Sequence, residues 1–157
     1  MSRRDQIKMS PEEIGAFLAE QRTVICATNG RDGWPHLMPL WYVVRDGDIW
    51  AWTYAASQKT RNLERDPRAT LQVEAGETYD QLRGVMFRTR VDIARDTDAV
   101  RALGLEIYSR YLEAGEGGLP GEVTEMIDRQ ASKRVALHFR PEGEPATWDH
   151  RKLGGTY

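Results

Sequence analysis

The segment QLRGVMFRTRVDIARD, at 81–96, constrains the fold more than any other part of the chain, because it alternates between apolar and polar positions. Successive side chains of a β-strand point to opposite faces of the sheet, so this pattern predicts a long strand with one buried face. Gly84, near its start, is expected to mark a bulge or a corner. One face carries Val85, Phe87, Thr89, Val91 and Ile93, and the other carries Met86, Arg88, Arg90 and Asp92.

Other segments also have the composition of strands and are joined by turn sequences. The turn RDGD, at 45–48, has Asp-Gly at its centre, which is typical of a hairpin. Antiparallel strands in this number close most easily into a small barrel, which removes free edges. We therefore expect an α+β fold built on a six-stranded antiparallel barrel with flanking helices. The strands are 23–28, 35–44, 49–54, 69–75, 81–96 and 133–141, and the tail can add one short strand.

Helical signals precede the first of these strands and separate some of the later ones. Ser10, followed by Pro11 and by Glu13 three residues after the cap, predicts a helix that ends near Gln21. A second helix is expected from 96 to about 115, and a shorter one over about 121–131. Residues 1–9 are predicted to form a loose polar arm, and residues 1–157 to form a single domain.

Composition narrows the class of protein. A formal net charge of −2 gives no general attraction to nucleic acid or to anionic membranes. There is no apolar run near the roughly 20 residues that span a bilayer, and no signal-peptide pattern. One cysteine, Cys26, fits a cytoplasmic protein. The three histidines lack metal-ligand spacing, so no metal site is expected.

The segment SQKTRNLERDPRA, at 57–69, predicts a short helix over 58–65 that is capped by Ser57 and stopped before Pro67. The first amides of a helix lack internal partners and favour negative charge, so the N-terminus of this helix can hold an anion. Lys59, Thr60 and Asn62 would add an ammonium, a hydroxyl and an amide, which suits a phosphate ester. The same residues also fit an ordinary helix start with a solvated face, and the pattern leaves both interpretations open.

The strand over 35–44 contains Pro39, which cannot donate to a ladder, so the strand is predicted to be interrupted or peripheral there. The backbone of Met38 and Leu40 would then be available to a planar heterocycle. Trp41, Trp50 and Trp52 can either wall such a site or belong to the core.

Two motifs, KTRNLERDPR and WDHRKLGG, together with the order of strands and helices from about residue 10 to 157, resemble a known family. The chain resembles the flavin- and deazaflavin-dependent reductases of the split β-barrel fold, the pyridoxamine 5′-phosphate oxidase-like superfamily. It is most similar to the group that uses the deazaflavin coenzyme F420, which is common in actinobacteria. The resemblance implies a homodimer with a cofactor in a groove between the subunits.

The resemblance also implies positions for the cofactor. Met38, Pro39 and Leu40 would lie beside the tricyclic ring, and Arg61 would reach the acidic glutamyl tail. The partner subunit would contribute Met86, Arg88 and Trp148. The phosphate end would be held by Thr53, Tyr54, Ala55, Ser57, Lys59, Thr60 and Asn62.

The chemistry implied by the resemblance is hydride transfer from reduced F420 to a conjugated or quinone-like small-molecule acceptor. An FMN-dependent oxidase or reductase of the same fold is the alternative, and a non-catalytic carrier of a cofactor, haem or lipid is another. No motif marks a catalytic acid. The candidate proton donors are His36, Tyr42, Tyr54 and Tyr79, besides water.

Overall fold

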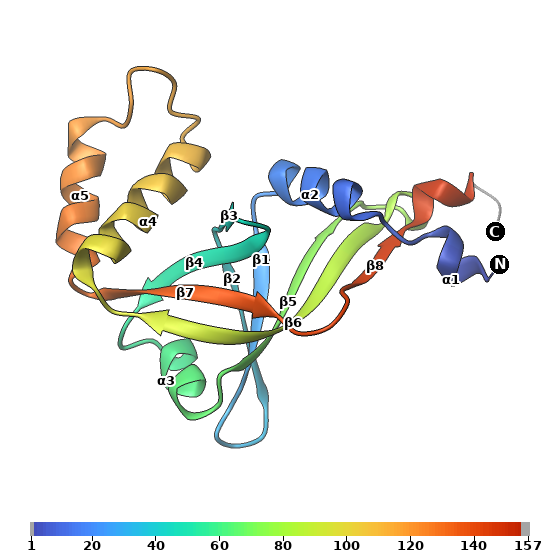
Figure 1. The fold of residues 1–157 in the computed structure, drawn as a ribbon, viewed down its shortest axis with the longest axis horizontal. Helices are drawn as coiled ribbons and strands as arrows, with labels where there is room; N and C mark the ends of the chain where they lie inside the picture. The colour runs from blue at the N-terminus through green and yellow to red at the C-terminus, as the bar shows by residue number, and fades with distance from the viewer. Residues whose placement is uncertain (1, 155–157) are drawn as a thin grey trace.

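The computed structural model describes residues 2–154, in which eight strands form one antiparallel sheet (Figure 1). The order of the strands is β2-β1-β5-β6-β7-β4-β3, with β8 paired to β6. The bounds are β1 Val24–Asn29, β2 Pro35–Leu40, β3 Val43–Arg45, β4 Asp48–Tyr54, β5 Arg68–Ala75, β6 Arg83–Ala94, β7 Arg134–Pro141 and β8 Ala146–Asp149.

The long strand β6 organises the sheet. One of its edges pairs with β5 over residues 83–90, while the other edge pairs first with β8 over 83–86 and then with β7 over 89–94. The sheet curls around this strand into a half-barrel. The predicted α+β split barrel, with flanking helices, is confirmed.

Five α-helices and two 3₁₀ turns accompany the sheet within the described range. In Figure 1, α4 and α5 stand together at one end, α2 covers another part of the sheet, and α3 lies below it. None of these helices is long and apolar enough to cross a membrane. The bounds are α1 Arg3–Gln6, α2 Pro11–Glu20, α3 Gln58–Arg65, α4 Thr97–Tyr111 and α5 Gly121–Ala131, with η1 Tyr79–Gln81 and η2 His150–Leu153.

The expected number of six strands is too low. The tail contributes β8, and the segment 35–44 divides into β2 and β3. The break has a physical cause, since both backbone groups of Tyr42 bind side chains of α4. Its N–H donates to Tyr111 Oη at 2.9 Å, and its carbonyl accepts from Arg110 Nη1 at 2.6 Å.

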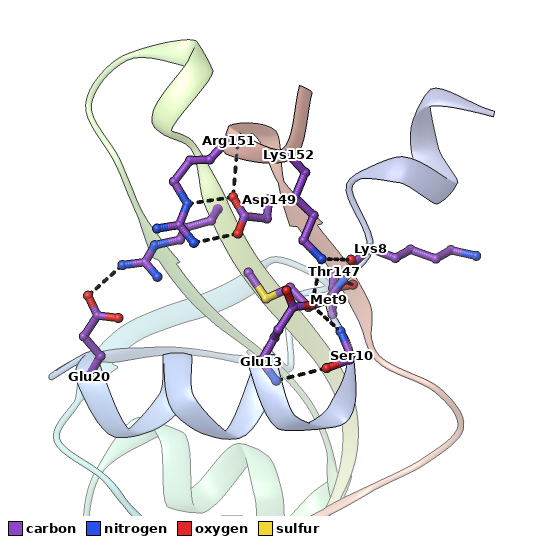
Figure 2. A network of polar contacts seen from close by, with 10 residues as sticks. Lys8, Met9, Ser10, Glu13, Glu20, Thr147, Asp149, Arg151 and Lys152 are labelled. Atoms are coloured by element: carbon purple, nitrogen blue, oxygen red, sulfur yellow. Dashed lines mark hydrogen bonds and ion pairs between the residues drawn. The ribbon is translucent and has the colours of Figure 1, made fainter. Parts of the chain in front are cut away.

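Residues 2–9 of the N-terminal arm are ordered rather than loose, and Met1 lies outside the described residues. Ser2 and Asp5 form a capping box that starts α1. After α1, Ile7 O accepts from Asp149 N at 2.7 Å. Met9 N donates to Thr147 Oγ1 at 3.0 Å, and Figure 2 shows these two residues side by side. The arm is therefore tied to β8, a contact between distant parts of the chain that local sequence does not predict.

Two apolar clusters make the core. The larger fills the barrel under α2, and the smaller packs α4 and α5 against β4 and β7. Trp52 belongs to the smaller cluster, whereas Trp50 stacks on His138 with 4.1 Å between ring centroids. Gly84 makes no bulge, because it pairs in register with Glu74 and Trp148. A Cβ at this position would lie 2.3 Å from Trp148 Cζ2, so the glycine provides room for that ring.

Candidate functional site

The end of β4 and the start of α3 gather a cluster of hydroxyl groups. Ser57 caps α3 as predicted, and its Oγ accepts from Thr60 N at 3.2 Å. The hydroxyls of Ser57 and Thr60 lie 3.0 Å apart, and Thr60 Oγ1 donates to Tyr54 O at 2.9 Å. The predicted bounds of the helix, 58–65, are confirmed. The structure thus brings this part of the expected phosphate seat together.

Lys59 is enclosed by the protein. It is only 4% exposed, and its Nζ donates to Thr53 Oγ1 at 3.3 Å. No carboxylate lies within ion-pair distance of it among residues 2–154. Burial lowers the pKa of Lys59, because the charged form loses hydration that one hydroxyl does not replace.

Lys59 lies close enough to Cys26 of β1 for the two groups to interact electrostatically. Burial raises the pKa of the Cys26 thiol to about 12. The thiol is therefore neutral near pH 7 and does not balance the ammonium charge. A buried ammonium without a counter-ion is costly, and an anion that binds beside it would relieve that cost. Because Lys59, Thr60 and Asn62 are buried while Arg61 is exposed, this stretch of α3 is not a solvated face.

Asn62 joins α3 to the sheet. Its Nδ2 donates to Thr28 Oγ1 at 3.0 Å, and its Oδ1 accepts from Gln58 Nε2 at 2.9 Å. Both ends of the amide are occupied within the chain. This residue positions the helix on β1.

The strand β2 lies at the edge of the sheet, as Pro39 indicated. Its only strand partner in the described chain is β1, where Met38 lies opposite Cys26 and Leu40 opposite Val24. The free edge continues into an exposed apolar surface. We call this surface the β2 patch, and it contains Trp34, Leu37, Met38 and Trp41.

A cavity of about 630 Å³ lies between one face of α3, from Gln58 to Arg65, and the β1–β2 turn. Three guanidinium-bearing residues line it, Arg31, Arg61 and Arg65, and Asp32 is the one acidic residue in its wall. His36 also lines this cavity, and its Nδ1 is a buried nitrogen without a hydrogen-bond partner in the described chain. We call this cavity the arginine pocket.

Sequence reasoning found only part of the arginine pocket. It selected Arg61 and named His36 as a proton donor, but it missed Arg31 and Arg65. The available signal was weak, because Arg31 lies in the turn NGRDG, far along the chain from α3. Only the pairing of β1 with β2 and the packing of α3 on β1 bring these residues together.

A second cavity, of about 650 Å³, lies over the face of β1, β5 and β6 and is lined by Arg88. Arg68 also lines it and pairs with Asp66 at 2.7 Å. The hydrogen bond from Arg68 holds the pKa of the Asp66 carboxyl well below its usual range. The wall of this cavity combines charged residues with apolar ones, such as Ala27 and Ala69.

Met86 and Trp148 do not meet the α3 cluster within one chain. They lie where β6 pairs with β8, and Figure 1 shows β8 and α3 at separate ends of the fold. Their assignment to a partner subunit's site stays a prediction.

The candidate proton donors differ in access. Tyr42 is fully buried and donates from its hydroxyl to Leu18 O at 2.6 Å, which removes it as a donor to a bound substrate. Tyr79 lies in η1 beside His150, near β8 rather than α3. Tyr54 is partly exposed at the end of β4, with the Arg134 guanidinium 4.0 Å from its ring centroid. Only Tyr54 and His36 lie near the start of α3.

The curled antiparallel sheet with flanking helices defines the class of split β-barrel proteins. The family model for pyridoxamine 5′-phosphate oxidase matches residues 10–144, so the chain belongs to that family. No curated protein matches the chain at a significant level.

Solved structures show the same fold. The conserved hypothetical protein Rv2991 from Mycobacterium tuberculosis is 41% identical, with a TM-score of 0.86 over 100% of this chain and 95% of that chain. A protein described as an F420 reductase is 22% identical, with a TM-score of 0.64 over 85% and 97% of the two chains. HutZ, a haem storage protein from Vibrio cholerae, is 18% identical, with a TM-score of 0.67 over 88% and 94%. The last two show likeness of fold alone.

Proposed function

We propose that this protein is an oxidoreductase that uses coenzyme F420 and transfers a hydride from its reduced form to a conjugated or quinone-like acceptor. The observation that carries the proposal is the arginine pocket, which runs along α3 from its first turn. A cofactor that continues beyond its phosphate into an acidic glutamyl tail needs several cations in a row there. FMN ends at its phosphate and has no group for such a pocket.

In this proposal the phosphate lies against the first turn of α3. The hydroxyl of Ser57 and the free amides of the first turn would donate to it, while the hydroxyl of Thr60 stays bonded to Tyr54 O. The ammonium of Lys59, buried beside Thr53, would add positive charge near that turn. The tail would then run over Arg61 toward Arg31.

The ring of the cofactor would lie along β2, beside Met38, Pro39 and Leu40. The free edge of this strand leaves backbone groups available to a heterocycle, and Met38 adds apolar surface. The β2 patch exposes four large apolar side chains in and beside an edge strand, which supports its being covered by a second copy of the chain. Met86, Arg88 and Trp148 of that copy would complete a groove between the subunits.

The bound cofactor supplies the hydride. The chain holds it, keeps water from the ring and positions the acceptor. Water in the groove would supply the proton, because the Nδ1 of His36 is buried and this residue lines the pocket assigned to the tail.

An FMN-dependent enzyme of the same fold is the second candidate, because the compact Ser57–Thr60 seat also fits a single phosphate monoester. Purified protein titrated separately with F420, FMN and haemin, and followed by tryptophan quenching, distinguishes the candidates. We expect tight binding of F420 alone. Tight binding of FMN without F420 would favour the second candidate, and binding of haemin alone would indicate a carrier.

Turnover is a separate question from binding. Reduced F420 mixed with the protein and a quinone acceptor should be oxidised at a rate that depends on acceptor concentration. Binding of F420 without any acceptor-dependent oxidation, over a panel of flat unsaturated acceptors, would contradict the enzymatic part of the proposal.

A further inference from the structure

A third cavity, of about 840 Å³, opens between α2 and the part of the sheet near β8. None of the candidate cofactor-binding residues lines it, and its volume is typical of a pocket for a small molecule. We call it the α2 cavity. Its apolar walls include Met9, Ile14, Leu18, Val44, Phe87 and Pro145.

Charged residues occupy the rim of the α2 cavity. Arg4 of α1 and Lys8 lie on it together with one acidic residue, Glu144. Lys8 pairs with Asp5 at 3.0 Å but stays largely exposed, and Arg4 makes no ion pair with any residue of 2–154. The rim therefore has an available positive charge next to an apolar interior.

The segment that carries these cations is held in place. Lys152 Nζ donates to Lys8 O at 2.6 Å and pairs with Glu13 at 2.7 Å (Figure 2). The backbone bonds of Ile7 and Met9 to β8 fix the same segment from the other side. Arg4 and Lys8 are thus presented at the rim by an anchored arm.

A glycine in the middle of α2 forms part of the wall of the α2 cavity. Gly15 of α2 lines the cavity, and an added Cβ would meet nothing within 4 Å. Glycine weakens a helix interior relative to alanine, so this position forgoes helix stability where a side chain would have space. The absence of a side chain at Gly15 keeps this side of the cavity open.

We propose that the α2 cavity binds a free amphiphilic molecule with an apolar chain and one anionic head group, such as a long-chain carboxylate. The chain would lie against Phe87 and Leu18, and the head group would lie between Arg4 and Lys8. This binding needs neither F420 nor the arginine pocket.

Isothermal titration of the intact protein with dodecanoate, below its micelle concentration, tests the proposal. We expect saturable binding of one molecule per chain. Gly15→Leu should fill the cavity and weaken binding at least about tenfold, whereas the matched Gly15→Ala should bind within about twofold of the native protein. Equal binding by Gly15→Leu and Gly15→Ala, or no saturable binding to the native protein, would overturn the proposal.

Changing the charge at the rim of the α2 cavity gives a second, independent test, with the affinity for dodecanoate as its readout. At low salt, Arg4→Glu should weaken dodecanoate binding about five- to tenfold, and Glu144→Gln should strengthen it about twofold. Dodecyltrimethylammonium, which has the same chain and the opposite charge, should bind more weakly than dodecanoate. Equal affinity for the two amphiphiles would show that Arg4 and Lys8 do not recognise a head group. Thermal unfolding of each variant verifies that it is folded.

Discussion

Lys59 Nζ lies 3.3 Å from Thr53 Oγ1, inside the protein and without a carboxylate partner in the described chain. A hydroxyl solvates an ammonium incompletely, so the charge destabilises the ligand-free fold, and an anion bound at the start of α3 would offset part of that cost. A residue that costs stability in this way is expected where function requires it.

Lys59→Met keeps the apolar stem and removes the charge. We predict that the free energy of unfolding of the ligand-free protein stays equal or rises by about 1 kcal/mol, since a buried unpaired charge is lost. Cofactor binding should weaken at the same time, and the loss should persist at high salt because a buried charge is screened little. Chemical denaturation and cofactor titration measure the two effects. A destabilised variant would instead assign Lys59 to the support of the fold.

Gly84→Ala should destabilise the protein by about 1–3 kcal/mol, because its Cβ would overlap the ring of Trp148 at 2.3 Å. Gly117→Ala, where an added Cβ meets nothing within 4 Å, is the matched control and should be nearly neutral. Adding Trp148→Leu to Gly84→Ala should recover part of the loss. Thermal denaturation measures the stability of each variant. If the double variant is no more stable than Gly84→Ala, the overlap with the Trp148 ring is not the cause of the loss.

The side chain of Arg110, in α4, caps the C-terminal end of α2. Its guanidinium donates to the carbonyl oxygens of Leu18 and Gln21 at 2.9 and 2.5 Å, besides that of Tyr42. Arg110→Met should cost about 3 kcal/mol in urea unfolding, because buried carbonyl groups lose a charged donor. Arg129→Met, at an exposed position of α5, should change stability by less than about 0.5 kcal/mol. Similar effects from both substitutions would contradict this role of Arg110.

Asp149 connects acid stability to the contact between the N-terminal arm and β8. The hydrogen bonds from Arg151 lower the pKa of Asp149 below its ordinary value of 3.8. The stabilisation is therefore complete above pH 3.8 and is lost as pH falls through the lower folded-state pKa. Asp149→Asn should cost about 1 kcal/mol near pH 7, since Arg151 is half exposed, and the cost should shrink on acidification. A cost that does not change from pH 7 to pH 2 would exclude this linkage.

Sequence patterns predicted the elements that depend on neighbouring residues. Ser57 and Pro67 bracket α3 by local capping and backbone rules, and the alternation of 85–93 gave the long strand β6. The edge position of β2 followed from Pro39, which cannot donate to a ladder.

Features that depend on distant residues were missed. The break at Tyr42 is caused by Arg110 and Tyr111 of α4, which bind its backbone in place of a strand. The enclosure of Lys59 follows from how α3 packs on β1, and its type and spacing alone suggested an exposed cation. The arginine pocket combines Arg31 of the β1–β2 turn with Arg61 of α3, and only the tertiary fold brings these two segments together.

The most direct test of the account is the affinity for F420 compared with that for the same deazaflavin without its glutamyl tail. The native protein should bind the tailed cofactor at least about tenfold more tightly at low salt, since the arginine pocket would hold the tail. Arg31→Ala combined with Arg61→Ala should remove most of this difference, and Arg101→Ala, on α4, should retain it. Equal affinity of the native protein for the two cofactors would contradict the assignment of the arginine pocket and, with it, the choice of F420 over FMN.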